Sequence, residues 1–169
     1  MKKRTGLLSL AALLVLALPA RAASPPPVLK IPGAPDRSIA PESLLGADRS
    51  DVRQESPSGD VTVFHGLPLL SVLEKAGVET RTMAGERRLT PAVVVVTARD
   101  GYTVVFSAGE LLMHRSDPRV FLVAETAAGP LPENEGPVRL IVYGDRSRSA
   151  YGLARIELKF LAENAPAKK

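Results

Sequence analysis

Three arginines in one short segment are the side chains of this sequence best suited to chemistry with an anion. Arg139 begins an apolar run, and Arg146 and Arg148 stand in the polar turn that follows it. A planar guanidinium can form two parallel hydrogen bonds to phosphate or sulfate, so the cluster could hold an anionic ligand. The same residues also fit a structural role, in which Arg139 pairs with Glu133 or Glu135 and the turn arginines are solvated. Surface ion pairs of this kind are common and nearly neutral in energy, which favours the structural role without excluding the first.

Other reactive side chains form weaker patterns. His65 and His114 are the only histidines and lie far apart in the sequence without ligand spacing, so we expect no metal site. We expect His65 to end a strand and His114 to cap a short helix at its negative end. Ser107 and Glu110 have the spacing of a capping box, which explains them better than a catalytic role. No serine elbow or glycine-rich phosphate loop is present, so no residue is assigned as catalytic.

The first 22 residues have the pattern of a signal peptide. A basic start precedes an apolar run of about twelve residues, which ends at Pro19 before small residues at positions 20 and 22. A bilayer span needs roughly twenty apolar residues. We therefore expect cleavage after Ala22, no membrane span in the mature chain, and a location in the periplasm or outside the cell.

Cleavage would remove the apparent basic character of the chain. The sequence has 22 Lys and Arg against 18 Asp and Glu, and the signal holds four of the basic residues and none of the acidic ones. The mature chain then has no formal net charge, and no basic and aromatic stripe indicates nucleic acid. It contains no cysteine, so it offers no thiolate to a metal or a substrate.

The mature chain divides into three parts. Residues 23–37 contain five prolines and are predicted to be a spacer or an extended arm. Residues 38–161 form the expected folded domain, and residues 162–169 a flexible tail. The domain is long enough to bury a core of its own.

Alternating apolar residues predict an α+β domain dominated by a mixed sheet. The clearest unit is a hairpin of residues 92–98 and 102–107 around the Asp100-Gly101 turn, with Val94 and Val96 or their neighbours pointing inward. A helix with apolar residues at helical spacing should end at Gly77. The remaining expected elements are a hairpin of 51–55 and 60–64, a helical turn at 41–45, a helix at 108–114 and strands at 120–125, 138–143 and 155–161.

Three segments together resemble a known family. They read "VTVFHGLPLLSVLEKAGV", "DGYTVVFSAGEL" and "GPLPENEGPVRLIVYGDRSRSAYGLARIEL" in that order. Their order and spacing are similar to the oxidoreductase molybdopterin-binding domain, the pterin domain of sulfite oxidase and its bacterial relatives. The resemblance covers about residues 38–161 and is strongest to short, stand-alone exported members. It implies a layered α+β sheet with a β-grasp-like element.

The resemblance also implies a cofactor site, from which this sequence departs. Family enzymes bind molybdopterin, and a protein cysteine completes the metal's ligands; here that ligand is missing. Basic and hydroxyl residues that hold the pterin phosphate in the family match Arg139, Arg148 and Ser149, but Tyr151 stands where a relative often has a second basic residue. Family enzymes that work outside the cytoplasm cross the membrane already folded, behind a signal with two paired arginines. This sequence has Lys3-Arg4 instead of paired arginines.

Two classes of function follow. The first is an exported protein of this fold without cofactor, which binds a small ligand, such as an anion, or a periplasmic protein partner. The alternative is a molybdopterin-dependent oxidoreductase of the sulfite oxidase family with an atypical metal site. Enzymatic activity therefore stays open, and the cofactor-free binding protein is the favoured hypothesis.

Overall fold

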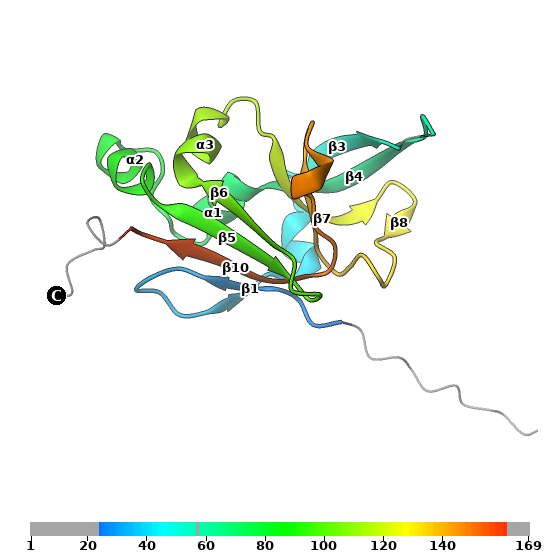
Figure 1. Cartoon of the computed structure of the whole chain (residues 1–169), viewed down its shortest axis with the longest axis horizontal. Coiled ribbons are helices and arrows are strands. Elements are labelled where there is room, and N and C mark those ends of the chain that lie inside the picture. The colour runs from blue at the N-terminus through cyan, green and yellow to red at the C-terminus, as the bar shows by residue number, and fades with distance from the viewer. Residues whose placement is uncertain (1–23, 57, 162–169) are drawn as a thin grey trace, which may run out of the picture.

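The computed structural model describes residues 24–56 and 58–161, which form two β-sheets with short helices gathered at one end (Figure 1). The predicted α+β class is confirmed in this part of the chain, and the predicted mixed sheet is present. The predicted signal peptide at 1–22 and the predicted tail at 162–169 lie outside the described residues. None of the helices in the described ranges is long and apolar enough to cross a membrane.

Sheet A has the strand order β2-β1-β10-β5-β6. Its first two strands pair antiparallel, β1 is parallel to β10, and the other neighbours are antiparallel. The sheet is therefore mixed because one short N-terminal strand joins it in the parallel direction. The strands are β1 (Val28–Lys30), β2 (Arg37–Ser38), β5 (Val93–Ala98), β6 (Thr103–Ser107) and β10 (Leu153–Lys159).

The hairpin of β5 and β6 is the one that the sequence predicts. Val94 pairs with Phe106 and Val96 with Val104, in antiparallel register. Gly101 has a φ of 89°, a conformation that glycine adopts without a steric penalty and that this tight turn requires. Val94 and Val96 are fully buried, so the inward face is the predicted one.

The region 23–37, predicted to be a spacer or an extended arm without regular structure, contains the strand β1. Val28 pairs with Arg155 of β10, and the Leu29 side chain is only 2% exposed. Prolines lack the N–H that a ladder needs, but here they flank the strand and do not interrupt it. A strand of three residues is too short to show alternation in the sequence, so the proline content dominated the prediction.

Sheet B is antiparallel, with β7 at its centre between β4 on one side and β8 and β9 on the other. The predicted hairpin of β3 and β4 is confirmed, with Glu55 opposite Val61. At Gly66 the two central strands approach so closely that a Cβ would lie 2.0 Å from the Leu122 carbonyl oxygen. Glycine is required there because no side chain fits. The strands are β3 (Ser50–Glu55), β4 (Val61–Pro68), β7 (Val120–Thr126), β8 (Gly129–Pro130) and β9 (Arg139–Val142).

Three α-helices and two 3₁₀ turns connect the strands in the described part of the chain. The sequence predicts α1 and its end at Gly77, α3 and the turn η1, but not α2, where only Gly85 and Leu89 are buried. So few buried positions give no amphipathic pattern to detect. The helices are α1 (Leu69–Lys75), α2 (Met83–Leu89), α3 (Ala108–Met113), η1 (Pro41–Leu44) and η2 (Arg146–Arg148).

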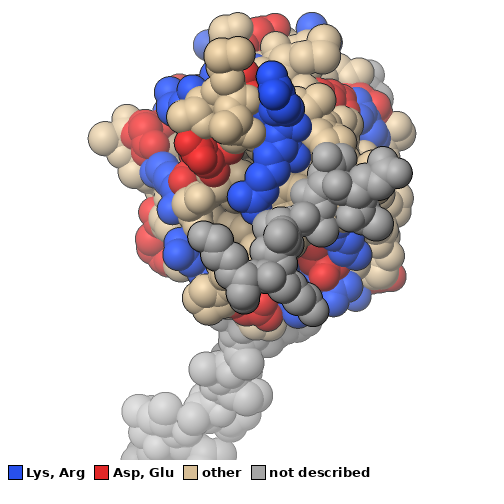
Figure 2. Space-filling view, turned by 90° about the vertical axis from the view of Figure 1, so that its left-hand side faces the viewer, with Lys and Arg blue, Asp and Glu red and all other residues tan. Residues whose placement is uncertain are grey.

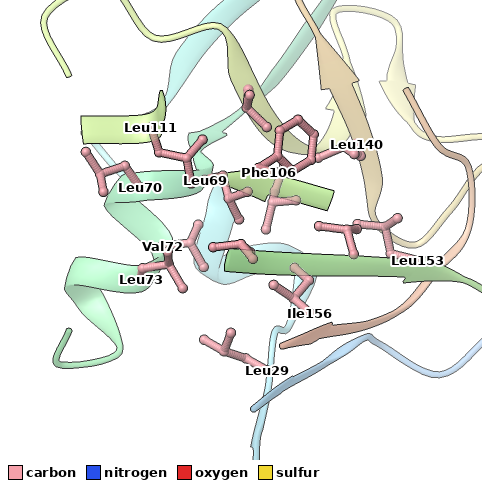
Figure 3. Close-up of a cluster of buried hydrophobic side chains, with 14 of the residues drawn as sticks. Leu29, Leu69, Leu70, Val72, Leu73, Phe106, Leu111, Leu140, Leu153 and Ile156 are labelled. Carbon is pink, nitrogen blue, oxygen red and sulfur yellow. The ribbon is translucent and has the colours of Figure 1, made fainter. Parts of the chain in front are cut away.

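The main core lies between sheet A, the inner face of sheet B and the helices. Figure 3 shows side chains of α1, such as Leu69 and Leu73, facing Phe106 of β6 and Ile156 of β10. A smaller apolar cluster, made of Val52, Phe64, Phe121, Val123 and Ile141, packs separately. Residues of β9 alternate between the two, because Leu140 belongs to the main core and Ile141 to the smaller cluster.

Candidate functional site

The chain after β9 folds back on the strand and brings the candidate residues together. Leu140 and Ala150 exchange two backbone hydrogen bonds, of 2.8 and 3.0 Å, as an isolated antiparallel bridge. Arg139 and Tyr151, the residues one position outward on each side, therefore lie opposite each other on the same face. The Ser149 Oγ accepts a 3.0 Å hydrogen bond from the Val142 backbone N–H, which fixes the return segment.

Arg139 is buried and tightly held. Its Nη1 donates to Glu135 Oε2 at 2.8 Å, and its Nη2 donates to the Gln54 side-chain oxygen at 2.7 Å. The guanidinium carbon lies 4.7 Å from the ring centre of Phe64 and 4.4 Å from that of Tyr151. The residue is 5% exposed, and its Nε is buried without a hydrogen-bond partner among the described residues. Two aromatic rings and two acceptors thus fix both the plane and the position of this cation.

Arg139 forms one wall of a pocket of about 430 Å³, which we call the Arg139 pocket. Ser149, Tyr151 and Arg146 line the same pocket. Within the described ranges the Arg146 side chain has no ion pair, and the Ser149 hydroxyl keeps its own proton free to donate. The side of the pocket near η2 therefore carries donors, while Gln54, Glu55 and Glu135 provide acceptors elsewhere in it.

Arg148 lies in a different environment. Its Nε donates to Asp145 Oδ2 at 2.9 Å, and its Nη1 donates to Glu110 Oε1 at 3.1 Å. Its side chain is about one-third exposed, with the guanidinium carbon 5.3 Å from the ring centre of Phe106. The hydrogen bonds from Ser147 and Arg148 hold the pKa of Asp145 below its ordinary value. Arg148 is thus part of an ion-pair cluster at the surface.

The predicted capping box at Ser107 is not formed. Ser107 is the N-cap residue of α3, but its side chain makes no capping hydrogen bond. The Glu110 carboxylate binds Arg148 instead, because the charged partner offers a stronger hydrogen bond than a backbone N–H. A contact 38 positions away in the chain therefore replaces the local one that the spacing predicts.

The three residues implied by the family resemblance are thus divided between two places. Arg139 and Ser149 line the Arg139 pocket, whereas Arg148 lines a separate cavity beside α1 and α3. The alternative pairing of Arg139 with Glu135 is confirmed. The sequence missed Gln54 and Phe64, which reach Arg139 from the β3–β4 hairpin, and no local pattern signals that contact.

The histidines lie in separate elements. His65 lies inside β4 and does not end it, and its Nδ1 is 2.8 Å from Asp51 Oδ1 across the hairpin. His114 is the C-cap residue of α3, as predicted. No group of three or more His, Cys, Asp or Glu that could hold a metal ion is found among residues 24–56 and 58–161.

The residues of the Arg139 pocket do not fit molybdopterin as the family binds it. Each amino group of Arg139 already donates one hydrogen bond, to Glu135 or to Gln54, and the charge of Arg139 is paired with Glu135, so the guanidinium offers a phosphate no unpaired charge. The pocket offers carboxylate, hydroxyl and amide oxygens, and the sequence has no thiolate to complete a molybdenum site. A ligand of this pocket must instead use the donors at Arg146, Ser149 and Tyr151.

Charges on the surface are mixed. On the face shown in Figure 2, Lys and Arg side chains form a stripe near the centre of the view, with Asp and Glu side chains on both sides of it. No protein-family model matches this sequence, and no curated protein matches it significantly. The family resemblance therefore stays a prediction, and the function must be argued from the geometry of the pocket.

Proposed function

We propose that the chain is an exported binding protein that works without molybdopterin and takes a small ligand with an anionic group in the Arg139 pocket. The observation that supports this proposal is the fixed, buried guanidinium of Arg139 between two aromatic rings. Holding a cation out of water is costly, and the surrounding contacts offset that cost while keeping the wall rigid. A rigid wall lowers the entropic cost of binding.

The anionic group of the ligand belongs at the η2 side of the pocket. Arg139 is neutralised by Glu135 at 2.8 Å and adds little net charge. Arg146 lacks an ion pair in the described part of the chain, and it lines the pocket together with Ser149 and Tyr151, whose hydroxyls can donate. Three donors in one pocket suit the oxygens of a carboxylate, sulfate or phosphate.

The alternative function is a molybdopterin-dependent oxidoreductase. It is the weaker proposal because the charge of Arg139 is already paired with Glu135 and no thiolate exists to bind the metal. A periplasmic protein that presents an acidic side chain is the other candidate ligand for the Arg139 pocket. Elemental analysis of the native protein decides the first of these alternatives.

Calorimetric titration tests the proposed ligand class. We expect one of phosphate, sulfate or a pterin monophosphate to bind the wild type, and Arg146→Gln to weaken that binding roughly tenfold, since a hydrogen bond to a charged group contributes about 1.5 to 3 kcal/mol. Arg119→Gln, which removes an arginine that does not line this pocket, is the matched control and should bind as the wild type does. Equal binding by both variants would show that the Arg139 pocket is not an anion site.

Elemental analysis of protein purified from its native periplasm tests the cofactor-free state. We expect no stoichiometric molybdenum or pterin, and an intact mass that begins at Ala23. Near-stoichiometric molybdenum would overturn the proposal in favour of the oxidoreductase. Recovery of the protein only with membranes, or with Met1 retained, would overturn the export prediction.

A further inference from the structure

A second cavity, separate from the Arg139 pocket, lies between α1, α3, the start of β7 and the turn after β9. It has a volume of about 250 Å³ and shares no lining residue with the Arg139 pocket. We call it the α1–α3 cavity. Its volume falls below the roughly 300 Å³ at which pockets for drug-sized ligands begin, so its occupant must be small.

The floor of the α1–α3 cavity is apolar. Leu70 of α1, Leu111 of α3, Val120 of β7 and Val142 of β9 line it, and all four side chains are buried. These residues come from four elements and all belong to the main core; Figure 3 shows Leu70 and Leu111 near each other. A hydrocarbon group placed on this floor would leave water without losing any hydrogen bond.

Two ionic clusters hold the walls in place. Arg115, just after the end of α3, donates to Glu74 of α1 at 2.9 Å and also to the Thr80 carbonyl oxygen, which joins the segment after α3 to α1. Arg148 and Glu110 join the turn after β9 to α3 at 3.1 Å. The cavity is therefore preformed, and a ligand would not have to order its walls.

The charge of the lining is not balanced. Four arginines line the cavity, at positions 81, 115, 119 and 148, against three acids, at 74, 110 and 145. Arg81, Arg115 and Arg148 each lie within 3.1 Å of one of these acids. Arg119 has only Asp117 at 4.0 Å, and both side chains are more than half exposed, so the pair is weak. One cation beside an apolar floor is thus left available.

We propose that the α1–α3 cavity binds a small organic monocarboxylate. Its hydrocarbon part lies on the floor of Leu70, Leu111, Val120 and Val142, and its carboxylate pairs with Arg119. One weakly paired arginine suits a monoanion better than a multiply charged phosphate. The apolar floor requires a hydrocarbon body, which inorganic anions lack.

Benzoate is the probe for this site, with benzamide as its neutral counterpart and acetate as the headgroup without the ring. Methyl NMR spectra should show saturable benzoate shifts at the floor residues, with a Kd of about 1 mM or tighter. Benzamide and acetate should bind roughly tenfold more weakly or not saturably. Benzamide lacks the negative charge that pairs with Arg119, and acetate lacks the ring that covers the apolar floor.

Variants separate this site from the Arg139 pocket. Arg119→Gln should weaken benzoate binding roughly tenfold, while Arg146→Gln, which lies in the other pocket, should leave it unchanged. Ser71→Phe, at a partly exposed position of α1 that lines the cavity, should fill the cavity and abolish the shifts while the amide spectrum stays native. Equal binding of benzoate and benzamide, no effect of Arg119→Gln, or no saturable binding by the wild type would each overturn the proposal.

Discussion

Arg139 and Arg148 stand nine positions apart and form opposite kinds of ionic site. The Arg139 side chain is 6% exposed and lies between two aromatic rings, with acceptors from β3 and from the loop before β9. The Arg148 side chain is 36% exposed and pairs with Asp145 in its own turn and with Glu110 of α3. The first site is a fixed internal support, and the second is a solvated surface cluster.

The burial and the ionic environment of each arginine depend on its position relative to the sheet, and not on the charges next to it in the sequence. Arg139 points from β9 to the side of the smaller apolar cluster, where Phe64 already removes water. Arg148 follows the strand, in a 3₁₀ turn whose residues are not buried. We therefore expect substitutions at the two arginines to differ in size, in salt dependence and in tolerance of lysine.

The largest effect should come from Arg139→Ala. This change removes a buried cation from its pair with Glu135 and leaves a gap between two rings. Breaking a buried ion pair costs about 3 to 5 kcal/mol, and the lower end applies because Glu135 is one-quarter exposed and can be hydrated. Urea unfolding should show a loss of about 3 kcal/mol in the free energy of unfolding.

Urea unfolding of Glu135→Gln provides a comparison for Arg139→Ala. Glu135→Gln removes the charge of the partner but keeps a hydrogen-bond acceptor, so it should cost less than Arg139→Ala. A loss below about 1 kcal/mol for Arg139→Ala would place Arg139 with ordinary surface pairs and break the contrast between the two sites.

Lysine substitution should give the next largest effect, at Arg139 only. Lysine keeps the charge, but it cannot stack as a plane between Phe64 and Tyr151 or donate to Glu135 and Gln54 together. We expect Arg139→Lys to lower the free energy of unfolding by about 1.5 kcal/mol, close to one hydrogen bond to a charged group. Arg148→Lys should change it by less than about 0.5 kcal/mol. Equal effects in thermal unfolding would contradict the planar role of Arg139.

Arg148→Ala should have a small effect that salt removes. Exposed ion pairs contribute about 0 to 1 kcal/mol, and at 1 M salt the screening length falls to about 3 Å. Urea unfolding at low and high salt should therefore show the cost of Arg148→Ala shrinking toward zero. The cost of Arg139→Ala should stay nearly constant, because the Arg139 side chain itself is shielded from the solvent. If the loss of stability in Arg148→Ala did not depend on salt, the contribution of Arg148 would not come from solvent-exposed ion pairs.

The sequence predicts this contrast only in part. It allows the Arg139–Glu135 pair, because the partners are four positions apart, and it predicts both hairpins from their turn residues and alternation. It cannot predict Gln54 as a partner of Arg139, since 85 positions separate them and only the pairing of β4 with β7 brings them close. The sequence did not predict strand β1 either, since its partner β10 also lies far away in the sequence, at the other end of the domain.

The smallest predicted effect is a shift in the titration of Asp145. Hydrogen bonds from Ser147 and Arg148 hold the pKa of this carboxyl below its ordinary value of about 3.9 in the folded protein. The unfolded chain therefore takes up a proton first as pH falls, so the stabilisation from Asp145 is complete above the ordinary pKa and is lost as pH falls through the folded-state value. In NMR titration of the Asp145 carboxyl, Arg148→Ala should raise its pKa toward the ordinary value, and Ser147→Ala should do the same, because each removes one donor. Arg139→Lys, on the other face of β9, is the control and should leave the titration unchanged. An unchanged Asp145 pKa in Arg148→Ala would mean that the ion pair is not populated in solution, and the surface cluster would then consist of Arg148 and Glu110 alone.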